Sequence, residues 1–179
     1  MSRFGSLRCP RQGRSFDAGW RLDGADDDAE VFASVYGRLR RFASVVRSPD
    51  MDPDDLVQEA LVRTLAKSRL IDLDDPVAYL RTVIVRVASN ERRRLGRRRR
   101  ALARAEERND IEAEYPSDVQ DLRHLDGKDR AAVYLAVVEM RPHSEIAEVL
   151  GCTEQASRAR LTRALAHLRV ELARETNHG

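Results

Sequence analysis

The chain has 179 residues, of which 42% are hydrophobic and 5% aromatic. This length accommodates one medium domain or two small ones, and a core poor in aromatic side chains favours helices over β-sandwiches. Charged residues make up 35% of the chain although the formal net charge is only +2, so oppositely charged segments cancel in the sum.

Several classes of function are excluded by the residues that carry chemistry. Cys9 and Cys152 form neither a metal-ligand spacing nor a disulfide framework, and the four histidines are scattered. No nucleophile–base arrangement or phosphate-binding loop accompanies them. No apolar run is long enough to span a membrane, and arginines interrupt the N-terminal stretch where a signal peptide would be apolar. We therefore expect a cytoplasmic protein with no catalytic residues, no metal, no cofactor and no membrane insertion.

The N-terminal part of the chain predicts a tail followed by a helix. Residues 1–28 mix Gly, Ser, Arg and Asp without periodicity, which is typical of a disordered tail. Asp26, Asp27 and Asp28 then precede the helix, where acidic side chains suit the helix dipole. Its apolar residues follow at helical spacing until Ser48-Pro49-Asp50: Val31, Phe32, Val35, Leu39, Phe42 and Val46.

A second helix is predicted to begin near Asp52 and Pro53, with Asp as the N-cap and Pro in the first turn. Its buried stripe is expected to comprise Leu56, Val57, Ala60, Leu61, Thr64 and Leu65. Its outer face is expected to carry Asp54, Asp55, Gln58, Glu59 and Arg63. No His, Cys or third carboxylate joins these acids, which favours a solvated face or a protein contact over a metal site.

After a short loop at residues 68–75, Pro76 is predicted to open a third helix that runs on into an arginine run between Arg92 and Arg100. The residues expected to face inward are Val77, Leu80, Val83, Ile84, Val87 and Ala88. So dense a run of arginines repels itself unless it meets anions, and contact with a DNA backbone supplies affinity but little sequence information. The alternative is a solvated helix end.

The remaining chain predicts an acidic linker at residues 101–121 and a second helical domain at residues 122–175. This domain contains a helix-turn-helix pattern, in which Ser144 is expected to cap one helix, Gly151 to end it in the left-handed conformation, and Thr153 to cap the next. The inward face of the last helix comprises Leu161, Ala164, Leu165 and Leu168. The fold class we predict is all-α, with two small helical domains, 29–100 and 122–175, joined by a flexible acidic linker.

The outer face of the last helix is the candidate DNA-binding surface. Arg158 and Arg163 are the candidates for base edges, and Arg160 is the candidate for phosphate, because a helix-turn-helix places its second helix in the major groove. Ala159 is too short for polar base contacts. The alternative is an amphipathic hairpin with solvated arginines.

Two separated segments resemble one family. In the first, Asp54 to Ala60 (DDLVQEA) is similar to an acidic helix of that family, and Tyr79 to Val83 with the arginine-rich tail is similar to its promoter-melting helix. In the second, Glu145 to Gly151 and Arg158 to Ala164 are similar to its helix-turn-helix. In this order, with an acidic linker between them, the segments resemble a bacterial RNA polymerase sigma factor of the extracytoplasmic-function type, in the sigma-70 family, over roughly 29–172.

The resemblance implies that the chain binds core RNA polymerase, directs it to promoters and assists melting. The helix after Asp52 would dock on the clamp helices of the β′ subunit through Asp54, Asp55, Leu56, Gln58, Glu59 and Arg63. The loop and third helix would bind the minus-ten element through Leu70, Ile71, Asp72, Tyr79, Arg86, Arg92 and Arg93. The last helix would lean on the β flap and bind the minus-thirty-five element through Thr153, Gln155, Arg158, Ala159, Arg160, Thr162 and Arg163. Many relatives are held inactive by an anti-sigma factor.

The chain departs from the family's pattern at three positions. Tyr79 stands where the family commonly has Trp, Arg86 where it often has Asn, and Ser157 where it usually has Val. A hydroxyl at the half-buried position of Ser157 predicts that the recognition helix packs less tightly on the domain or shifts slightly in register. The alternative function is a stand-alone helix-turn-helix regulator that binds duplex DNA without polymerase, with the first domain as a dimerisation unit.

Overall fold

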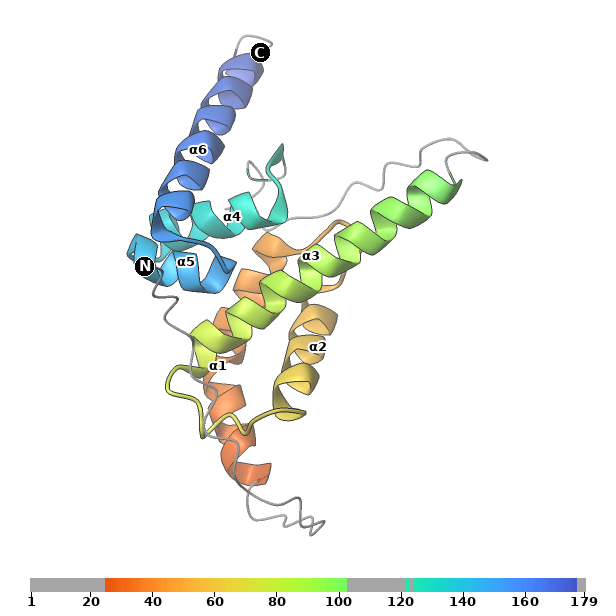
Figure 1. Ribbon diagram of the computed structural model, residues 1–179, viewed down its shortest axis with the longest axis vertical. Coiled ribbons are helices and arrows are strands. Elements are labelled where there is room, and N and C mark those ends of the chain that lie inside the picture. Colours follow the sequence, from red (N-terminus) through yellow and green to blue (C-terminus); the bar gives the residue numbers. More distant parts are fainter. Residues whose placement is uncertain (1–24, 103–121, 123, 177–179) are drawn as a thin grey trace.

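A computed structural model describes residues 25–102, 122 and 124–176, and over these residues the chain is all-α, as predicted (Figure 1). The first domain consists of α1 (Ala25–Val46), α2 (Pro53–Leu65) and α3 (Pro76–Leu102). The second consists of α4 (Gly127–Val133), the π-helical turn η3 (Tyr134–Val138), α5 (His143–Leu150) and α6 (Glu154–Thr176). The predicted linker, apart from the residues that end α3, and most of the predicted tail lie outside the described residues.

Helix α1 extends further toward the N-terminus than the sequence suggested. It begins at Ala25, so four residues assigned to the tail form its first turn. Three of them are acidic and stabilise the positive end of the helix dipole. The predicted apolar face is confirmed in its central part, where Val35, Leu39, Phe42 and Val46 are all buried.

Helix α2 begins as predicted, because the Asp52 carboxylate accepts hydrogen bonds from the backbone N–H of Asp54 (2.7 Å) and of Asp55 (3.4 Å). Leu56, Val57, Ala60 and Thr64 are buried. Leu65 was wrongly expected in this stripe and is 46% exposed. At about 100° per residue it lies roughly opposite Leu56 on the helix.

Helix α3 is capped by Asp75, whose carboxylate accepts from the N–H of Ala78 at 2.9 Å. Five of its six predicted inward residues are buried, and Val83 is partly buried. The helix continues through the arginine run as predicted, but the side chains beyond Arg92 lie outside the described residues.

The helix-turn-helix consists of α5 and α6. Helix α5 begins after Pro142, which occupies the N-cap without a side-chain bond, so the prediction that Ser144 caps it is wrong. Proline's fixed φ suits the extended backbone at that position. The other two signals are confirmed: Gly151 adopts a left-handed φ of 64°, and the Thr153 hydroxyl accepts from the N–H of Ala156 at 3.2 Å.

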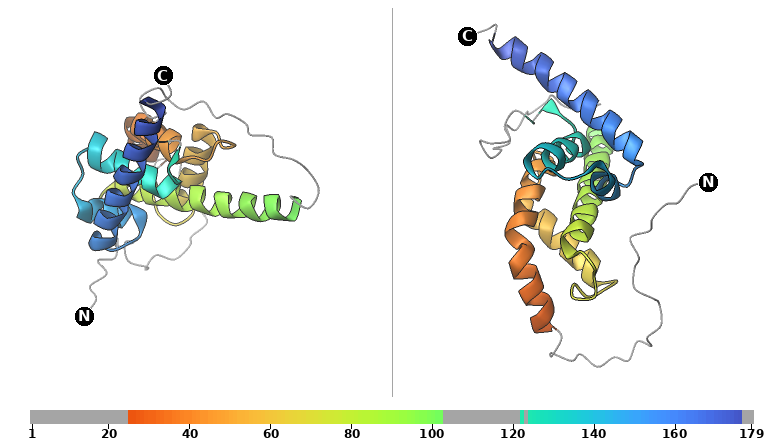
Figure 2. Two further views of the ribbon diagram at one scale, coloured as in Figure 1. Left: turned by 90° about the horizontal axis from the view of Figure 1, so that it is seen from above. Right: turned by 90° about the vertical axis from the view of Figure 1, so that its left-hand side faces the viewer.

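The two domains pack against each other. Helix α4 lies against α1, and α5 lies against α3 (Figures 1 and 2). One hydrophobic cluster includes Leu39 and Ile84 of the first domain together with Ala131, Leu135 and Ile146 of the second. The described parts of the domains therefore share a core, which the sequence did not predict.

Arg130 of α4 closes the end of α1. Its guanidinium is buried and donates to the carbonyl oxygens of Val45 (2.6 Å), Val46 (3.2 Å) and Arg47 (2.6 Å), and also to that of Leu125 (2.6 Å). The last carbonyls of an α-helix have no partner within the helix, and a cation is favourable at that end. The second domain thus supplies the hydrogen-bond donors that the end of α1 lacks.

Arg81 of α3 lies deeper in the same interface. It is 3% exposed, pairs with the carboxylate of Glu139, and lies 5.3 Å from the centroid of the Phe42 ring. The Phe42 ring also contacts that of Tyr134 across the domains, with centroids 6.1 Å apart. Polar and aromatic contacts therefore both hold the second domain against the first.

Two glycines allow the docking to be tested with one chemical change. A Cβ on Gly127, the first residue of α4, would lie 2.8 Å from the carbonyl oxygen of Val46, whereas a Cβ on Gly37 of α1 would meet nothing within 4 Å. Gly37→Ala should raise the free energy of unfolding by about 0.5–1 kcal/mol. Gly127→Ala should lower it by about 1–3 kcal/mol and separate the domains.

Urea unfolding measures the stabilities, and small-angle X-ray scattering measures the radius of gyration. If Gly127→Ala matched Gly37→Ala in both, the close approach of α4 to α1 would not exist in solution.

Candidate polymerase- and DNA-binding surfaces

The outer face of α2 carries the acidic surface that the sequence predicted. Asp55, Gln58 and Glu59 are exposed, and Glu59 accepts from Arg63 at 2.6 Å. Val62 lies on the same face and is 63% exposed. Val62 was not among the predicted surface residues, although an apolar side chain out of phase with the buried stripe is a readable signal in the sequence. The face therefore combines carboxylates with one exposed apolar side chain.

Two other residues that the resemblance assigned to polymerase binding do not lie on this exposed face. The Asp54 carboxylate faces α1, where it accepts from the Tyr36 hydroxyl (2.5 Å) and from Arg40 Nε (2.8 Å). The hydrogen bond from Tyr36 lowers the pKa of Asp54, and Arg40 lowers it further. Leu56 is 1% exposed and belongs to the core beneath the face. Asp54 and Leu56 thus fix α2 in place rather than extend its exposed surface.

The candidate minus-ten residues fall into two groups. In the α2–α3 loop, Ile71 and Asp72 are exposed. Leu70, which precedes them, is completely buried in the core. On α3, Tyr79 is half-buried and Arg86 is exposed, and their spacing of seven residues places them on one face of the helix. Arg92 is exposed at the far end, and the side chain of Arg93 lies outside the described residues.

The candidate recognition face of α6 is exposed over its first three turns. The residues that lie there are Gln155, Arg158, Ala159, Thr162 and Arg163. Arg158 pairs with Glu154 at 2.5 Å, and Arg163 Nε donates to the carbonyl oxygen of Ala159 at 3.3 Å. An exposed pair one turn apart on a helix contributes only about 0.3–0.5 kcal/mol, so Arg158 can exchange this partner for another acceptor at little cost.

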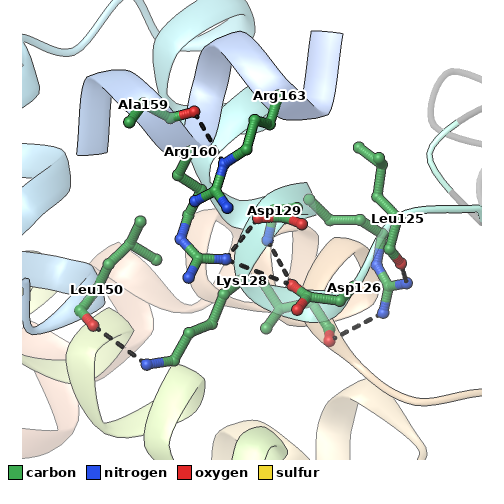
Figure 3. Close-up of polar contacts among 10 residues, drawn as sticks. Leu125, Asp126, Lys128, Asp129, Leu150, Ala159, Arg160 and Arg163 are labelled. Atoms are coloured by element: carbon green, nitrogen blue, oxygen red, sulfur yellow. Dashed lines mark hydrogen bonds and ion pairs between the residues drawn. The ribbon is translucent and has the colours of Figure 1, made fainter. Parts of the chain in front are cut away.

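Arg160 differs from its neighbours on α6. It points toward α4, where it pairs with Asp129 at 2.5 Å and lies 3.8 Å from Asp126 (Figure 3). Asp126 in turn caps α4 by accepting from the N–H of Asp129 at 2.8 Å. The residue expected at a phosphate is therefore engaged in holding the recognition helix against α4. Lys128 adds a contact from α4 to α5, donating to the Leu150 carbonyl oxygen at 3.4 Å (Figure 3).

Ser157 has a partner that explains how a hydroxyl is accommodated under the recognition helix. The residue is completely buried, and its Oγ lies 3.2 Å from Nδ1 of His143, in hydrogen-bond contact. A buried hydroxyl with a partner avoids the desolvation cost that an unpaired one would carry. The pair joins the first residue of α5 to α6, which identifies His143 as part of the helix-turn-helix.

Two further observations concern the described residues as a whole. None of their helices combines the length and the apolar character needed to cross a bilayer. No group of three or more His, Cys, Asp and Glu side chains among them is arranged to hold a metal ion.

The bond between Tyr36 and Asp54 should be visible in the pH dependence of stability. Because the folded-state pKa of Asp54 lies below the value of about 3.9 for an unfolded chain, its carboxylate stabilises the fold above that pH. The contribution is lost as the pH falls through the folded-state pKa. We expect Asp54→Asn to flatten the fall in Tm between about pH 5 and pH 3. Asp55→Asn, an exposed neighbour, is the control and should follow the wild-type curve.

Comparison with known proteins identifies the family of both domains. The family model for sigma-70 region 2 matches residues 31–98, and that for sigma-70, region 4 matches residues 122–168. The structure resembles the sigma factor RpoE from Bartonella quintana, solved in complex with the anti-sigma factor NepR, at 20% sequence identity and a TM-score of 0.66, over 83% of this chain and 98% of that one. No curated protein sequence matches the chain. Since the two family models together cover more than half of it, the chain belongs to the sigma-70 family of RNA polymerase sigma factors, with the region 2 and region 4 arrangement of the extracytoplasmic-function type.

Proposed function

We propose that this sigma factor docks on the β′ clamp helices of core RNA polymerase through the exposed acidic face of α2. The α2–α3 loop and the adjoining face of α3 bind the minus-ten element and assist melting, and the exposed face of α6 reads the minus-thirty-five element. The protein carries out no catalysis of its own and works in the cytoplasm, where polymerase and promoters are. The observation that carries the proposal is the presence of both exposed faces, acidic on α2 and basic on α6, in the two matched regions.

The docked arrangement of the domains cannot reach both promoter elements at once. The elements are separated by about 25 base pairs, or roughly 85 Å at 3.4 Å per base pair. The longest described helix, α3, has 27 residues and is about 40 Å long, roughly half of that distance. We infer that the contacts of Arg130 with the end of α1 break when the protein engages a promoter on the polymerase.

An anti-sigma partner fits this scheme. RpoE from Bartonella quintana was solved in complex with the anti-sigma factor NepR, and the likeness to it covers 83% of this chain, more than either domain alone contains. A partner that bound both domains in their docked arrangement would keep the protein from spanning a promoter. The partner would limit the distance that the protein can span, without having to cover the exposed face of α6.

The test of the function is in vitro transcription with purified core polymerase on a fragmented genomic template, with and without this protein. We expect new transcripts from discrete start sites, whose upstream sequences define both promoter elements. Duplex binding by the protein alone, with no new transcripts, would instead indicate a stand-alone regulator.

Charge reversal on α2 tests the docking face. Asp55→Lys and Glu59→Lys should each reduce the affinity for core polymerase by about tenfold or more, because juxtaposed like charges across an interface cost several kcal/mol. Glu30→Lys, an equal reversal at an exposed position of α1, is the control. Titration of labelled protein with core polymerase measures the affinity. Unchanged binding by both α2 variants would rule out this face.

Arginine truncation on α6 tests base recognition. Arg158→Ala and Arg163→Ala should each lose about 1–3 kcal/mol of discrimination at particular base pairs of the minus-thirty-five element. Arg169→Ala, exposed further along the same helix, is the control. Transcription from templates carrying every single substitution in the element provides the measurement. An equal loss on every template would identify the two arginines as phosphate contacts instead.

A further inference from the structure

The loop that carries the proposed minus-ten contacts is held from two sides. From the core side, Leu70 is completely buried, and a turn follows in which the N–H of Leu73 donates to the Leu70 carbonyl oxygen at 3.2 Å. Next to this anchor, Ile71 and Asp72 are exposed. Burial of Leu70 anchors the loop to the core, but it does not determine how the exposed residues Ile71 and Asp72 are oriented.

The second anchor is Asp28, in the first turn of α1. Its Oδ1 accepts from the backbone N–H of Ile71 at 3.1 Å, and its Oδ2 lies 3.3 Å from the donor Nε of Arg69. The side chain of Asp28 is only 15% exposed. One carboxylate thus binds the residues on both sides of Leu70, across more than forty positions of sequence.

Arg69 is part of the same contact. Its guanidinium lies between Asp28 and Asp27, the latter at 3.6 Å, and the hydrogen bond to Asp28 raises its pKa above the ordinary value. An arginine already balanced by two carboxylates attracts a phosphate less than an uncompensated one does. It is better suited to holding the loop than to contacting DNA.

We propose that Asp28 is a positioning residue for minus-ten recognition, which orients the exposed tip of the α2–α3 loop through the amide of Ile71 and the guanidinium of Arg69. The proposal rests on the function assigned to that loop above. Melting the minus-ten element is costly, and a loop already held in its binding shape does not lose further conformational freedom when it binds the exposed strand. Asp28 lies before residue 31, where the match to the region 2 model begins.

The test uses holoenzyme assembled from core polymerase and the full chain, with Asp28→Ala, Asp28→Asn and the control Asp26→Ala. The probes are a single-stranded minus-ten oligonucleotide and a duplex minus-thirty-five fragment, both taken from the mapped promoters. Asp28→Ala should bind the single strand about tenfold more weakly, because hydrogen bonds to charged groups are worth about that factor. Asp28→Asn keeps an acceptor for the Ile71 N–H and should recover part of the loss. Asp26→Ala should bind as wild type.

Three readouts separate positioning from a general effect on folding. Core affinity, duplex minus-thirty-five affinity and the salt dependence of single-strand binding should stay at wild-type values in Asp28→Ala. Arg69→Ala should give the same loss, and the double variant should be no weaker than either single one. A parallel drop in all affinities would reduce Asp28 to a structural residue, and a shallower salt dependence in Arg69→Ala would make that arginine a phosphate contact; either result overturns the proposal.

A loop variant distinguishes failure of this proposal from failure of the function on which it rests. The double substitution Ile71→Ala and Asp72→Ala removes the exposed tip itself. If this variant bound the single strand as wild type, the loop would not be a minus-ten site and both assignments would fall. If it lost binding while Asp28→Ala did not, only the positioning role of Asp28 would be wrong.

Discussion

The structure depends on the insertion of Arg130 at the end of α1. A helix that ends inside a protein needs donors for its last carbonyl oxygens, and here three of them receive those donors from one side chain of the other domain. Gly127 allows the approach, since its missing Cβ leaves room for the Val46 carbonyl. The aromatic contact of Phe42 with Tyr134 and the burial of Arg81 follow from the same docking.

The interface combines two kinds of contact that differ in what their opening costs. The carbonyl oxygens and the guanidinium of Arg130 regain hydrogen bonds to water when they separate, so this part costs less than exposing an equal area of packed leucine. The shared cluster that includes Leu39, Leu135 and Ile146 carries the larger cost, because its apolar side chains become exposed. In the docked form, the outer faces of α2 and α6 remain exposed. Docking therefore limits the distance that the protein can span, while it leaves the two faces that we propose for recognition exposed.

The sequence predicted three of the four capping and turn signals correctly, because these signals are local. The cap at Asp52, the left-handed Gly151 and the cap at Thr153 each depend on residues within one turn, and all three were confirmed. The Ser144 cap failed because a neighbouring proline occupied the N-cap instead. The orientation of Asp54 could not be read locally, since its partners on α1 lie 14 and 18 positions away.

Arginine explains most of what the sequence could not predict about the site. The residue donates equally well to phosphate, carboxylate and carbonyl oxygens, so its position in the chain does not reveal its acceptor. The fold uses Arg130 on carbonyls, Arg81 on Glu139 and Arg160 on Asp129, all inside the protein. An arginine-rich composition thus overstates the surface offered to DNA. Of the arginines proposed to bind DNA on α6, Arg158 and Arg163 remain exposed, and their present partners are weak enough to exchange for a base.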